Sequence, residues 1–557
     1  MAPPTPLLLT LTSAAICMLK ATFLPDLFPG IKLTTFFLLT AAVVFGSWTI
    51  WKLFIYPNFA SPLRHLPQPK SGIIPGLGPK QLITRREIGE LFLKWIVDIP
   101  NEGLISFPGI FGTDNLLCTE PSSLAEVLVH KSYDFEKPTE LRNFLRIILG
   151  DGLIIVEGDM HKFQRKNVAP AFSFRHIKEL IPLFWKKARE MADEITAEIK
   201  NHPEPVAGEK SSGNPTGVVE VNHWANKVTM DIIGVAGLGR DFNSLHNTDD
   251  ELVANYEEIL EPTAEKAMFF GANLMTSPRF VKMLPWKLNE TLSKTMGALR
   301  GACQQLLADK KAALAADNKE QTVNILSLLI QSNNFSDEML IDQLLTFIAA
   351  GHETTSSAFT WATHLLAINP SVQSKLREEI RAALPSPSEP WDPSIDTASI
   401  LENLPYLHGI TSEVIRLYPT VPTTMRIAVR PTHIGTQFVP QGTRVFLTPW
   451  GVNRSPHLWG PTAGDFAPER WIDADTGRLN NHGGVASNYA NLTFLHGPRS
   501  CIGERFARSE LKALLAVFCG RFDIAMADPA EVPVPAGVIT SKPKNGMRLR
   551  LKVVEGW

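Results

Sequence analysis

A single cysteine in a glycine- and proline-rich loop constrains this chain more than any other feature. The loop reads Phe494-Leu495-His496-Gly497-Pro498-Arg499-Ser500-Cys501-Ile502-Gly503. Apolar residues recur at helical spacing directly after it: Phe506, Leu511, Leu514, Leu515 and Phe518. The positive end of the predicted helix dipole favours a thiolate at Cys501, and Arg499 adds further positive charge.

The two glycines of this loop leave room for a flat, bulky group. Gly497 and Gly503 carry no side chain, so a planar ligand can approach the backbone closely. A thiolate held in this way suits the axial position of haem iron, where it favours O–O cleavage. The alternative is an inert, buried cysteine in a turn. A zinc site is disfavoured, because the chain has no C-x-x-C and His496 with Cys501 supplies two ligands at most.

The loop resembles the haem-binding loop of the cytochrome P450 monooxygenases, whose pattern is F-x-x-G-x-R-x-C-x-G. All of the fixed positions of that pattern are met, by Phe494, Gly497, Arg499, Cys501 and Gly503. The resemblance implies a haem b cofactor, bound by these residues, with Cys501 as the axial ligand of its iron. Further family motifs stand upstream in the expected order, so the resemblance covers nearly all of the chain after residue 80.

The composition is that of a large globular protein. The chain has 557 residues, of which 44% are hydrophobic and 20% are charged, which is enough to build a large core. Its net charge of −2 gives no electrostatic argument for nucleic-acid binding. The chain has 5 cysteines, an odd number, and they are widely spaced in the sequence. This pattern does not indicate a disulfide framework, so the body of the protein is expected in a reducing compartment.

Residues 1–56 are predicted to form a membrane anchor. The main span is expected at about residues 33–55, a predominantly apolar run of the length that a bilayer requires. Aromatic residues cluster near one end of this run, as they do at membrane interfaces: Trp48, Trp51 and Tyr56. Basic residues after the span favour a cytosolic catalytic domain. For the earlier apolar stretch, residues 6–18, a second span, a re-entrant piece and an interfacial segment all stay open.

Residues 57–80 contain prolines at a density that predicts a stiff, extended linker. The resemblance implies one haem-thiolate monooxygenase domain over residues 81–557, mainly α with small β-sheets. Local patterns agree with this fold class, because residues 103–118 indicate a β-hairpin and the alternating tail after Met547 indicates a half-buried strand.

A long helix is predicted from Ser336 to just before Pro370. Its middle reads Ala350-Gly351-His352-Glu353-Thr354-Thr355, and polar groups between apolar turns favour a local break in the helix. This segment resembles the family's [AG]-G-x-[DE]-T-[TS] motif. The resemblance implies that Thr354 hydrogen-bonds oxygen on the iron and that Glu353 helps to relay protons. The other interpretation is a surface helix on which both side chains are exposed.

Three arginines and a histidine are expected to serve the haem propionates. His161 and Arg165 occupy the positions of the family's W-x-x-x-R, with histidine in place of tryptophan. Arg426 resembles a second propionate-binding arginine, and Arg499 a third. Arginine suits carboxylates because it forms forked, charge-assisted hydrogen bonds. Without the resemblance, the basic cluster around Arg165 is equally compatible with a solvated helix face.

Glu413 and Arg416 lie three residues apart, on one face of a helix predicted over residues 406–416. On their own they are compatible with a surface ion pair. The resemblance implies a buried structural triad that Arg470 completes, within a segment that ends in Trp471 where the family has phenylalanine.

The resemblance implies an enzyme that inserts one atom of O₂ into a lipophilic small molecule. Its electrons would come from a separate NADPH-dependent reductase or a cytochrome b-type donor, at the endoplasmic reticulum membrane. The expected pocket residues are mostly apolar or small: residues 135–148, Phe347, Ile348, Thr423, Thr424 and Val538. The sequence resembles fungal members that modify terpenoids or polyketides. The alternatives are a fatty acid or xenobiotic hydroxylase, a haem-thiolate isomerase that does not use O₂, and a haem sensor or carrier.

Overall fold

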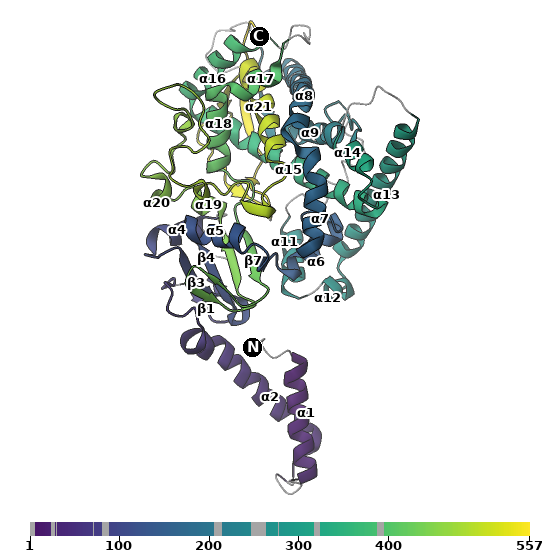
Figure 1. Ribbon diagram of the computed structural model, residues 1–557, viewed down its shortest axis with the longest axis vertical. Coiled ribbons are helices and arrows are strands. Elements are labelled where there is room, and N and C mark those ends of the chain that lie inside the picture. Colours follow the sequence, from purple (N-terminus) through teal and green to yellow (C-terminus); the bar gives the residue numbers. More distant parts are fainter. Residues whose placement is uncertain are drawn as a thin grey trace. The chain divides into compact units, whose positions relative to one another are not determined.

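The computed structural model describes residues 6–23, 28, 30–70, 72–80, 89–204, 214–246, 263–276, 278–316, 324–386, 395–537 and 539–557. Their contacts divide the chain into two compact units. The first, here called the sheet unit, comprises Met1–Arg86, Lys94–Glu136 and Thr424–Leu447. The second, here called the helical unit, comprises Glu87–Leu93, Lys137–Thr423 and Thr448–Trp557. Figure 1 labels the elements of both units.

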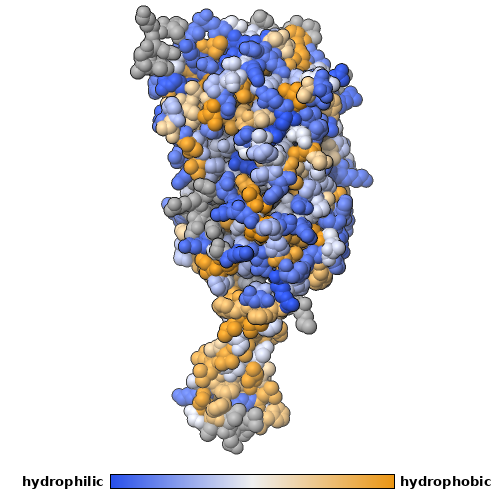
Figure 2. Space-filling model, turned by 90° about the vertical axis from the view of Figure 1, so that its left-hand side faces the viewer, coloured by the Kyte–Doolittle hydropathy of each residue, from blue (hydrophilic) through white to orange (hydrophobic). Residues whose placement is uncertain are grey.

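Two apolar helices open the sheet unit. Helix α1 (Pro6–Phe23) packs against α2 (Leu33–Ile50), which continues as the π-helix η1 (Trp51–Ala60) (Figure 1). The stretch Leu33–Ala60 is long and apolar enough to cross a membrane, by length and composition. Hydrophobic residues cover much of the narrow lower part of Figure 2. On α2 the exposed hydrophobic residues include Leu38 and Val43. The helix thus has the outer surface expected of the predicted anchor.

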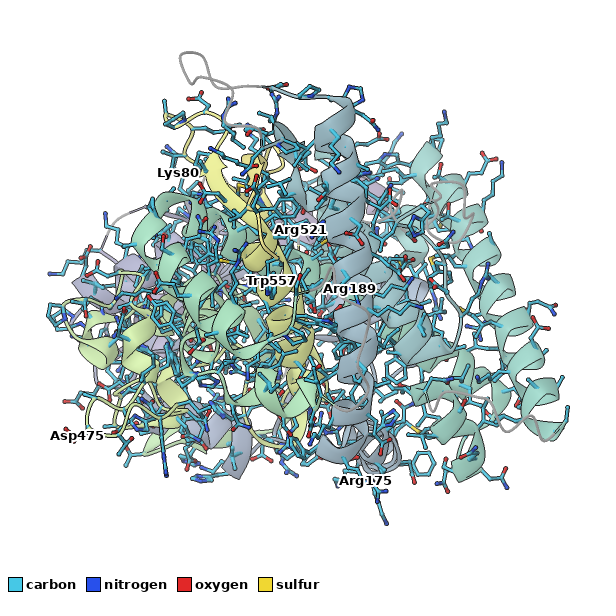
Figure 3. The ribbon with its side chains drawn as sticks, turned by 90° about the horizontal axis from the view of Figure 1, so that it is seen from above. Lys80, Arg175, Arg189, Asp475, Arg521 and Trp557 are labelled. Carbon is cyan, nitrogen blue, oxygen red and sulfur yellow. The ribbon has the colours of Figure 1, made fainter. Side chains whose placement is uncertain are left out.

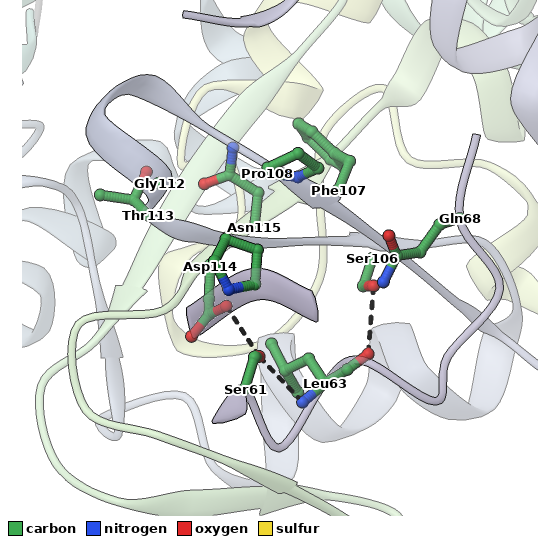
Figure 4. Close-up of a pocket in the computed structure, with 11 residues that line it drawn as sticks. Ser61, Leu63, Gln68, Ser106, Phe107, Pro108, Gly112, Thr113, Asp114 and Asn115 are labelled. Atoms are coloured by element: carbon green, nitrogen blue, oxygen red, sulfur yellow. Dashed lines mark hydrogen bonds between the residues drawn. The ribbon is translucent and has the colours of Figure 1, made fainter. Parts of the chain in front are cut away.

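The segment predicted as an extended linker is partly folded. η1 runs through Pro57, and Asp114 connects its end to the hairpin of β3 (Leu104–Pro108) and β4 (Asp114–Cys118). The Tyr56 hydroxyl donates to Asp114 Oδ2 at 2.7 Å, and the Ser61 hydroxyl donates to Asp114 Oδ1 at 2.9 Å. Figure 4 shows Ser61 with its neighbour Leu63, whose carbonyl accepts a hydrogen bond from the Ser106 hydroxyl. Further along, β1 (Ile73–Ile74) and β2 (Gly78–Pro79) pair as an antiparallel hairpin.

A five-stranded sheet with the order β3-β4-β10-β7-β5 forms the body of the sheet unit. Its strands are β3 (Leu104–Pro108), β4 (Asp114–Cys118), β5 (Phe135–Glu136), β7 (Thr424–Ala428) and β10 (Arg444–Leu447). β10 pairs with β4 in parallel, and the remaining pairs are antiparallel. The hairpin predicted over residues 103–118 is therefore confirmed. The Phe107 ring packs between those of Trp95 and Phe446, with centroids 5.1 and 5.3 Å away.

Shorter elements complete this unit. They are η2 (Ile110–Gly112), α5 (Pro121–Ala125), η3 (Glu126–His130), β8 (Thr432–Ile434) and β9 (Gln437–Val439). Helix α4 (Glu90–Asp98) contributes residues to both units.

The helical unit is built from helices that pack around α15 (Asp337–Ile368) (Figure 1). The helices before it are α6 (Thr139–Leu149), α7 (Gly158–Val168), η4 (Ala169–Phe172), α8 (Phe174–Asn201), α9 (Val221–Ile233), η5 (Gly234–Leu238), α11 (Ala264–Met275), α12 (Pro278–Met283), α13 (Lys287–Ala315) and α14 (Ile325–Ser332). Those after it are α16 (Pro370–Ala383), α17 (Thr397–Asn403), α18 (Pro405–Leu417), α19 (Pro449–Val452), α20 (Pro456–Trp459), η6 (Pro468–Trp471), η7 (Asn488–Ala490), η8 (Gly497–Arg499) and α21 (Glu504–Arg521). The predicted class, mainly α with small sheets, is confirmed.

Helix α15 begins and ends as its sequence predicts. The Ser336 side chain accepts a hydrogen bond from the amide of Met339, which caps the first turn, and Pro370 starts the next helix. The predicted break in the middle is wrong, because α15 continues without interruption. The Thr354 hydroxyl donates to the Ala350 carbonyl at 2.7 Å, so this polar group is satisfied within the helix.

A three-stranded antiparallel sheet closes the helical unit, in the order β11-β14-β6. Its strands are β6 (Thr216–Glu220), β11 (Phe522–Met526) and β14 (Arg548–Val553), and β14 confirms the predicted tail strand. A separate hairpin joins β12 (Pro535–Ala536) to β13 (Lys542–Pro543). The last residue, Trp557, lies against α21 in Figure 3, where its carbonyl accepts from Arg521 at 2.9 Å. A Cβ atom on Gly520 would lie 1.9 Å from the indole of Trp557, so this close approach requires glycine.

Candidate active site

The Cys501 loop is closed by its own backbone. The amide of Cys501 donates to the Phe494 carbonyl at 2.8 Å, across a turn in which Leu495 and Gly497 have positive φ values of 55° and 76°. The turn leads into α21 through Gly503. Cys501 is exposed, whereas the other cysteines, all within the described residues, are buried. The loop therefore presents one accessible thiol beside the start of a helix.

The neighbours of Cys501 act on the pKa of its thiol in both directions. The side chain has accessible surface, but the protein around it desolvates the thiol and raises its pKa to about 11, whereas the Gly503 amide and Arg165 lower the pKa and Glu504 raises it. The expectation that the helix start and Arg499 favour a thiolate stays a prediction. A bound cation would reverse this balance, since metal coordination deprotonates a thiol.

Arg165 holds the loop next to the cysteine. From α7 its Nη1 donates to the Ser500 carbonyl at 2.6 Å, and its Nη2 donates to the Ser500 hydroxyl at 3.3 Å. His161 lies one turn earlier on α7 and is buried. Burial, together with the charge of Arg499, lowers the pKa of His161 to about 4. His161 is therefore neutral at pH 7.

Glu157 is a site residue that sequence reasoning missed. Its carboxylate lies 2.5 Å from Arg499 Nη2 and 2.9 Å from Lys137 Nζ, just before α7 begins. Burial raises the pKa of Glu157, but the charges of Lys137 and Arg499 outweigh burial and hold it below the ordinary value. The one signal in the sequence was its position four residues before His161, directly before the helix that carries His161 and Arg165.

A few residues in the middle of α15 are partly accessible, although the helix around them is buried. Between Leu344 and Ala367 its residues are buried except for four, which are Ala349, Ala350, Gly351 and Thr354. Gly351 also lets α9 approach closely, because a Cβ atom there would lie 2.8 Å from Ile233 Cδ1. Thr354 is therefore half-buried on the oxygen-handling segment that the sequence predicts.

Phe172 connects this helix to the cysteine loop. Its ring lies 5.6 Å from that of Phe347 on α15, centroid to centroid, in an edge-on arrangement. A Cβ atom on Gly503 would lie 3.9 Å from the same Phe172 ring. The loop and α15 thus line one region of the helical unit.

The polar side chains on either side of Thr354 are buried. Glu353 forms an ion pair with Lys542, 3.0 Å from Oε1 to Nζ, so α15 is not a surface helix that exposes this acid. Glu510 on α21 lies beside Thr355 and is fully buried. Burial raises the pKa of Glu510 well above its ordinary value, which favours the neutral acid. Sequence reasoning singled out neither Lys542 nor Glu510.

Glu413, Arg416 and Arg470 come together as the resemblance implied. Arg416 donates to both carboxylate oxygens of Glu413, at 2.7 and 2.8 Å, and both side chains are fully buried. Arg470 donates to Glu413 Oε1 at 2.9 Å. Trp471, which stands where the family has phenylalanine, donates from its indole nitrogen to Glu413 Oε2 at 2.8 Å. The replacement thus adds a hydrogen bond to the cluster.

Arg426 belongs to the sheet unit, so its expected contact with a propionate stays a prediction. It lies on β7, is buried, and donates to the Met425 carbonyl at 2.9 Å. Of the expected pocket residues in the helical unit, Phe347 and Ile348 are buried and Thr423 is half-buried. Val538 lies outside the described residues.

Comparison with known proteins decides the family. The family model for cytochrome P450 matches residues 110–549. The chain belongs to the cytochrome P450 family. It is 39% identical to the cytochrome P450 monooxygenase sphH of Aspergillus fumigatus, over 95% of each chain. It is 38% identical to the cytochrome P450 monooxygenase ptmK of Penicillium ochrochloron, over 92% of this chain and 97% of the other. This cytochrome P450 is therefore an enzyme of the monooxygenase class with a haem-iron cofactor.

The residues present in this cytochrome P450 fit a haem. The accessible Cys501 thiol supplies a ligand of the right kind for its iron. Three cationic side chains, Lys137, Arg165 and Arg499, and the one carboxylate of Glu157 lie near His161. Such an excess of positive charge suits the two propionates of a haem.

Proposed function

We propose that this cytochrome P450 inserts one oxygen atom from O₂ into a lipophilic intermediate of secondary metabolism, of the terpenoid or polyketide type. One observation carries the proposal: an accessible Cys501 thiol in a loop that Arg165 holds, at the start of α21. The likeness to fungal P450 monooxygenases supports the reaction class. The apolar residues of α15 near Thr354 support a lipophilic substrate.

We assign the cofactor contacts to residues of the cysteine loop and α7. Cys501 Sγ would hold the iron of haem b, and Arg165, Arg499 and His161 would hold the propionates, together with Arg426. Phe494, Gly497 and Gly503 would shape the loop around the macrocycle. When bound, the haem supplies the activation of O₂. The protein must supply protons and exclude bulk water around this chemistry.

Thr354 and Glu353 would handle those protons. The Thr354 hydroxyl gives its own hydrogen to the Ala350 carbonyl, so its oxygen can accept a second hydrogen bond from the reacting side. Glu353 is the adjacent acid, and its side chain is 11% exposed, which leaves a narrow route for exchange with water. The buried apolar turns before Ala349 limit the entry of other water.

Members of the family generally use redox-partner reductases and oxidise lipophilic substrates. For this chain we propose an NADPH-dependent reductase, with the catalytic domain on the cytosolic side of the endoplasmic reticulum membrane. The apolar helix Leu33–Ala60 supports the membrane attachment. We propose residues 1–56 as the anchor, residues 57–80 as the connection and residues 81–557 as the catalytic domain. Oxygen uptake that depends on the reductase would separate this function from an isomerase.

The first prediction concerns the thiolate. We expect the reduced full-length protein to give a thiolate-type shifted absorption band with carbon monoxide, because Cys501 is the accessible thiol of the site. Cys501→Ser removes the sulfur and should abolish this band. Cys17→Ser, in the N-terminal helix α1, is the matched control and should keep it. A histidine-type band in the wild type, or a thiolate-type band in Cys501→Ser, contradicts the proposal.

A further inference from the structure

The ion pair between Glu353 and Lys542 connects α15 to the β12–β13 hairpin, which lies far from it in the sequence. Lys542 Nζ lies 3.0 Å from Glu353 Oε1, and the two side chains are 16% and 11% exposed. Desolvation makes such a pair costly, so it persists only when its geometry is well supported, and removal of one partner leaves an uncompensated charge. The pair therefore depends on what fixes Lys542.

The position of Lys542 is fixed by hydrogen bonds between the backbone of the β12–β13 hairpin and side chains of α15. The carbonyl of Ser541, the residue before Lys542, accepts hydrogen bonds from the Ser357 hydroxyl and from the Trp361 indole. The amide of Ser541 donates to the Thr420 carbonyl at 2.8 Å. Since Glu353, Ser357 and Trp361 are spaced by four residues, they form one face of α15. The hairpin is thus fastened along this face, next to Thr354.

The nearby titratable groups do not balance the charge of Glu353. His352 is buried and its Nδ1 lies 3.0 Å from the Thr229 hydroxyl oxygen. Burial, together with the charge of Lys542, lowers the pKa of His352 to about 3, so His352 is neutral at pH 7. Burial raises the pKa of Glu510, on the α21 side, which favours its neutral form. Lys542 is therefore the cation that the described contacts place against this carboxylate.

We propose that Lys542 is a positioning residue that holds the Glu353 carboxylate beside Thr354, so that the β12–β13 hairpin sets the geometry of proton delivery. The proposal rests on the proposed function, in which Glu353 carries protons. It predicts that the position of Glu353 changes when the cation is lost, even where the haem is bound normally. Arginine at position 542 can keep the pair, whereas glutamine cannot.

The first test asks whether the pair exists, and it needs no turnover. The lysines of the full-length protein are methylated with ¹³C-formaldehyde, and Lys542→Arg identifies the Lys542 resonance. We expect Glu353→Gln to move this resonance, because its ion-pair partner is gone. The resonance of Lys544, an exposed lysine two residues along the chain, is the matched control and should not move. A Lys542 resonance that Glu353→Gln leaves in place overturns the proposal.

The second test follows the fate of O₂ in the haem-loaded protein with reductase and NADPH, without added substrate. Oxygen that takes two electrons and two protons leaves as hydrogen peroxide, whereas four electrons and four protons give two waters. In Lys542→Gln we expect water formation to slow on the order of tenfold, less than the loss of about a hundredfold that a misplacement of about 1 Å can cause. The peroxide share rises accordingly, while Lys542→Arg and the control Lys544→Gln keep the wild-type ratio.

The outcomes separate this proposal from the proposed function. An unchanged peroxide share in Lys542→Gln, with a normal carbon monoxide spectrum, overturns the role of Lys542 and leaves the monooxygenase intact. A wild type without the thiolate-type band refutes the proposed function, and the positioning role falls with it. If Lys542→Gln fails to take up haem, Glu353→Asp serves instead, since its shorter side chain retracts the carboxylate from Lys542 and should raise the peroxide share in the same direction.

Discussion

At the scale of single residues, Glu510 is a carboxylic acid enclosed by the protein core. It lies on α21 beside Thr355 of α15, and it is fully buried. Burial raises its pKa well above the ordinary value, and Thr355 lowers it by a smaller amount. The folded protein therefore keeps a proton on Glu510 at pH values where the unfolded chain, with a carboxyl pKa of about 4.3, has released it.

This difference gives a pH-dependent prediction. Because the native state holds the extra proton, the free energy of unfolding should fall as pH rises above about 4.3, by up to about 1.4 kcal/mol per pH unit, until the folded pKa is reached. Glu510→Gln keeps the shape and removes the titration. We expect its melting temperature to exceed that of the wild type by a margin that widens as the pH rises above about 4.3.

Glu504→Gln is the matched control for Glu510→Gln, because Glu504 stands in the first turn of the same helix and its side chain is 41% exposed. Its melting curve should follow the wild type across the pH range, within the small effect of its pair with Arg508. A constant offset between Glu510→Gln and the wild type at every pH would show that Glu510 titrates normally.

The contrast between Cys501 and Glu157 shows what the sequence could predict at this scale. Cys501 was found because its loop carries the whole pattern within ten consecutive residues. Glu157 was missed because its partner Arg499 lies 342 residues away, and only the folded chain brings the two together.

At the scale of elements, the buried carboxylate of Glu413 joins α18 to the segment around η6. Arg416 also donates to the carbonyls of Asn453 and Ala463, each at 2.7 Å, so the cluster reaches the chain beyond α19 and α20. Glu413 is the acid that the described contacts place against both Arg416 and Arg470. Loss of Glu413 would leave Arg416 and Arg470 in the buried cluster without the carboxylate that pairs with both of them.

We therefore expect Glu413→Ala to prevent haem incorporation and to lower the free energy of unfolding by about 3–5 kcal/mol, the cost of breaking a buried pair by halves. Haem content per folded protein and the melting temperature measure the two effects. Glu469→Ala is the control, because Glu469 lies in the same η6 turn but its pair with Lys375 is exposed and contributes at most about 1 kcal/mol. Normal haem content in Glu413→Ala would refute the structural role.

Helical periodicity predicted α15 and its ends, but the sequence did not predict the continuity of α15 or the helical conformation of η1 at Pro57. Polar residues in mid-helix favoured a break, but the hydroxyl of Thr354 bonds back to its own helix and the helix stays continuous. The prolines after residue 56 favoured an extended chain, but Pro57 is accommodated within η1. Both features involve a hydrogen bond that the residue pattern alone does not predict. The Thr354 hydroxyl donates to the Ala350 carbonyl, and the Ser61 amide donates to the Tyr56 carbonyl.

At the scale of the whole molecule, the apolar helix and the sheet that follows it are one folded piece. The exposed apolar surface of Leu33–Ala60 would be costly in water, which favours burial in a bilayer. The end of the same helix holds the sheet through the hydroxyls of Tyr56 and Ser61, both on Asp114. Truncation at different residues should therefore remove membrane attachment with or without a loss of stability of the sheet unit.

We expect a chain that starts at residue 51 to be extracted from membranes by alkaline carbonate, whereas the full-length chain stays in the pellet, because most of the span is gone. A chain that starts at residue 64 should be extracted as well, but its melting temperature should be lower. It has lost two hydrogen bonds to the carboxylate of Asp114, each contributing about 1.5–3 kcal/mol. Asp114→Asn in the longer chain is the control and should reproduce part of that loss. Equal melting temperatures for the two truncated chains would mean that the residues after Ile50 serve the membrane and not the sheet.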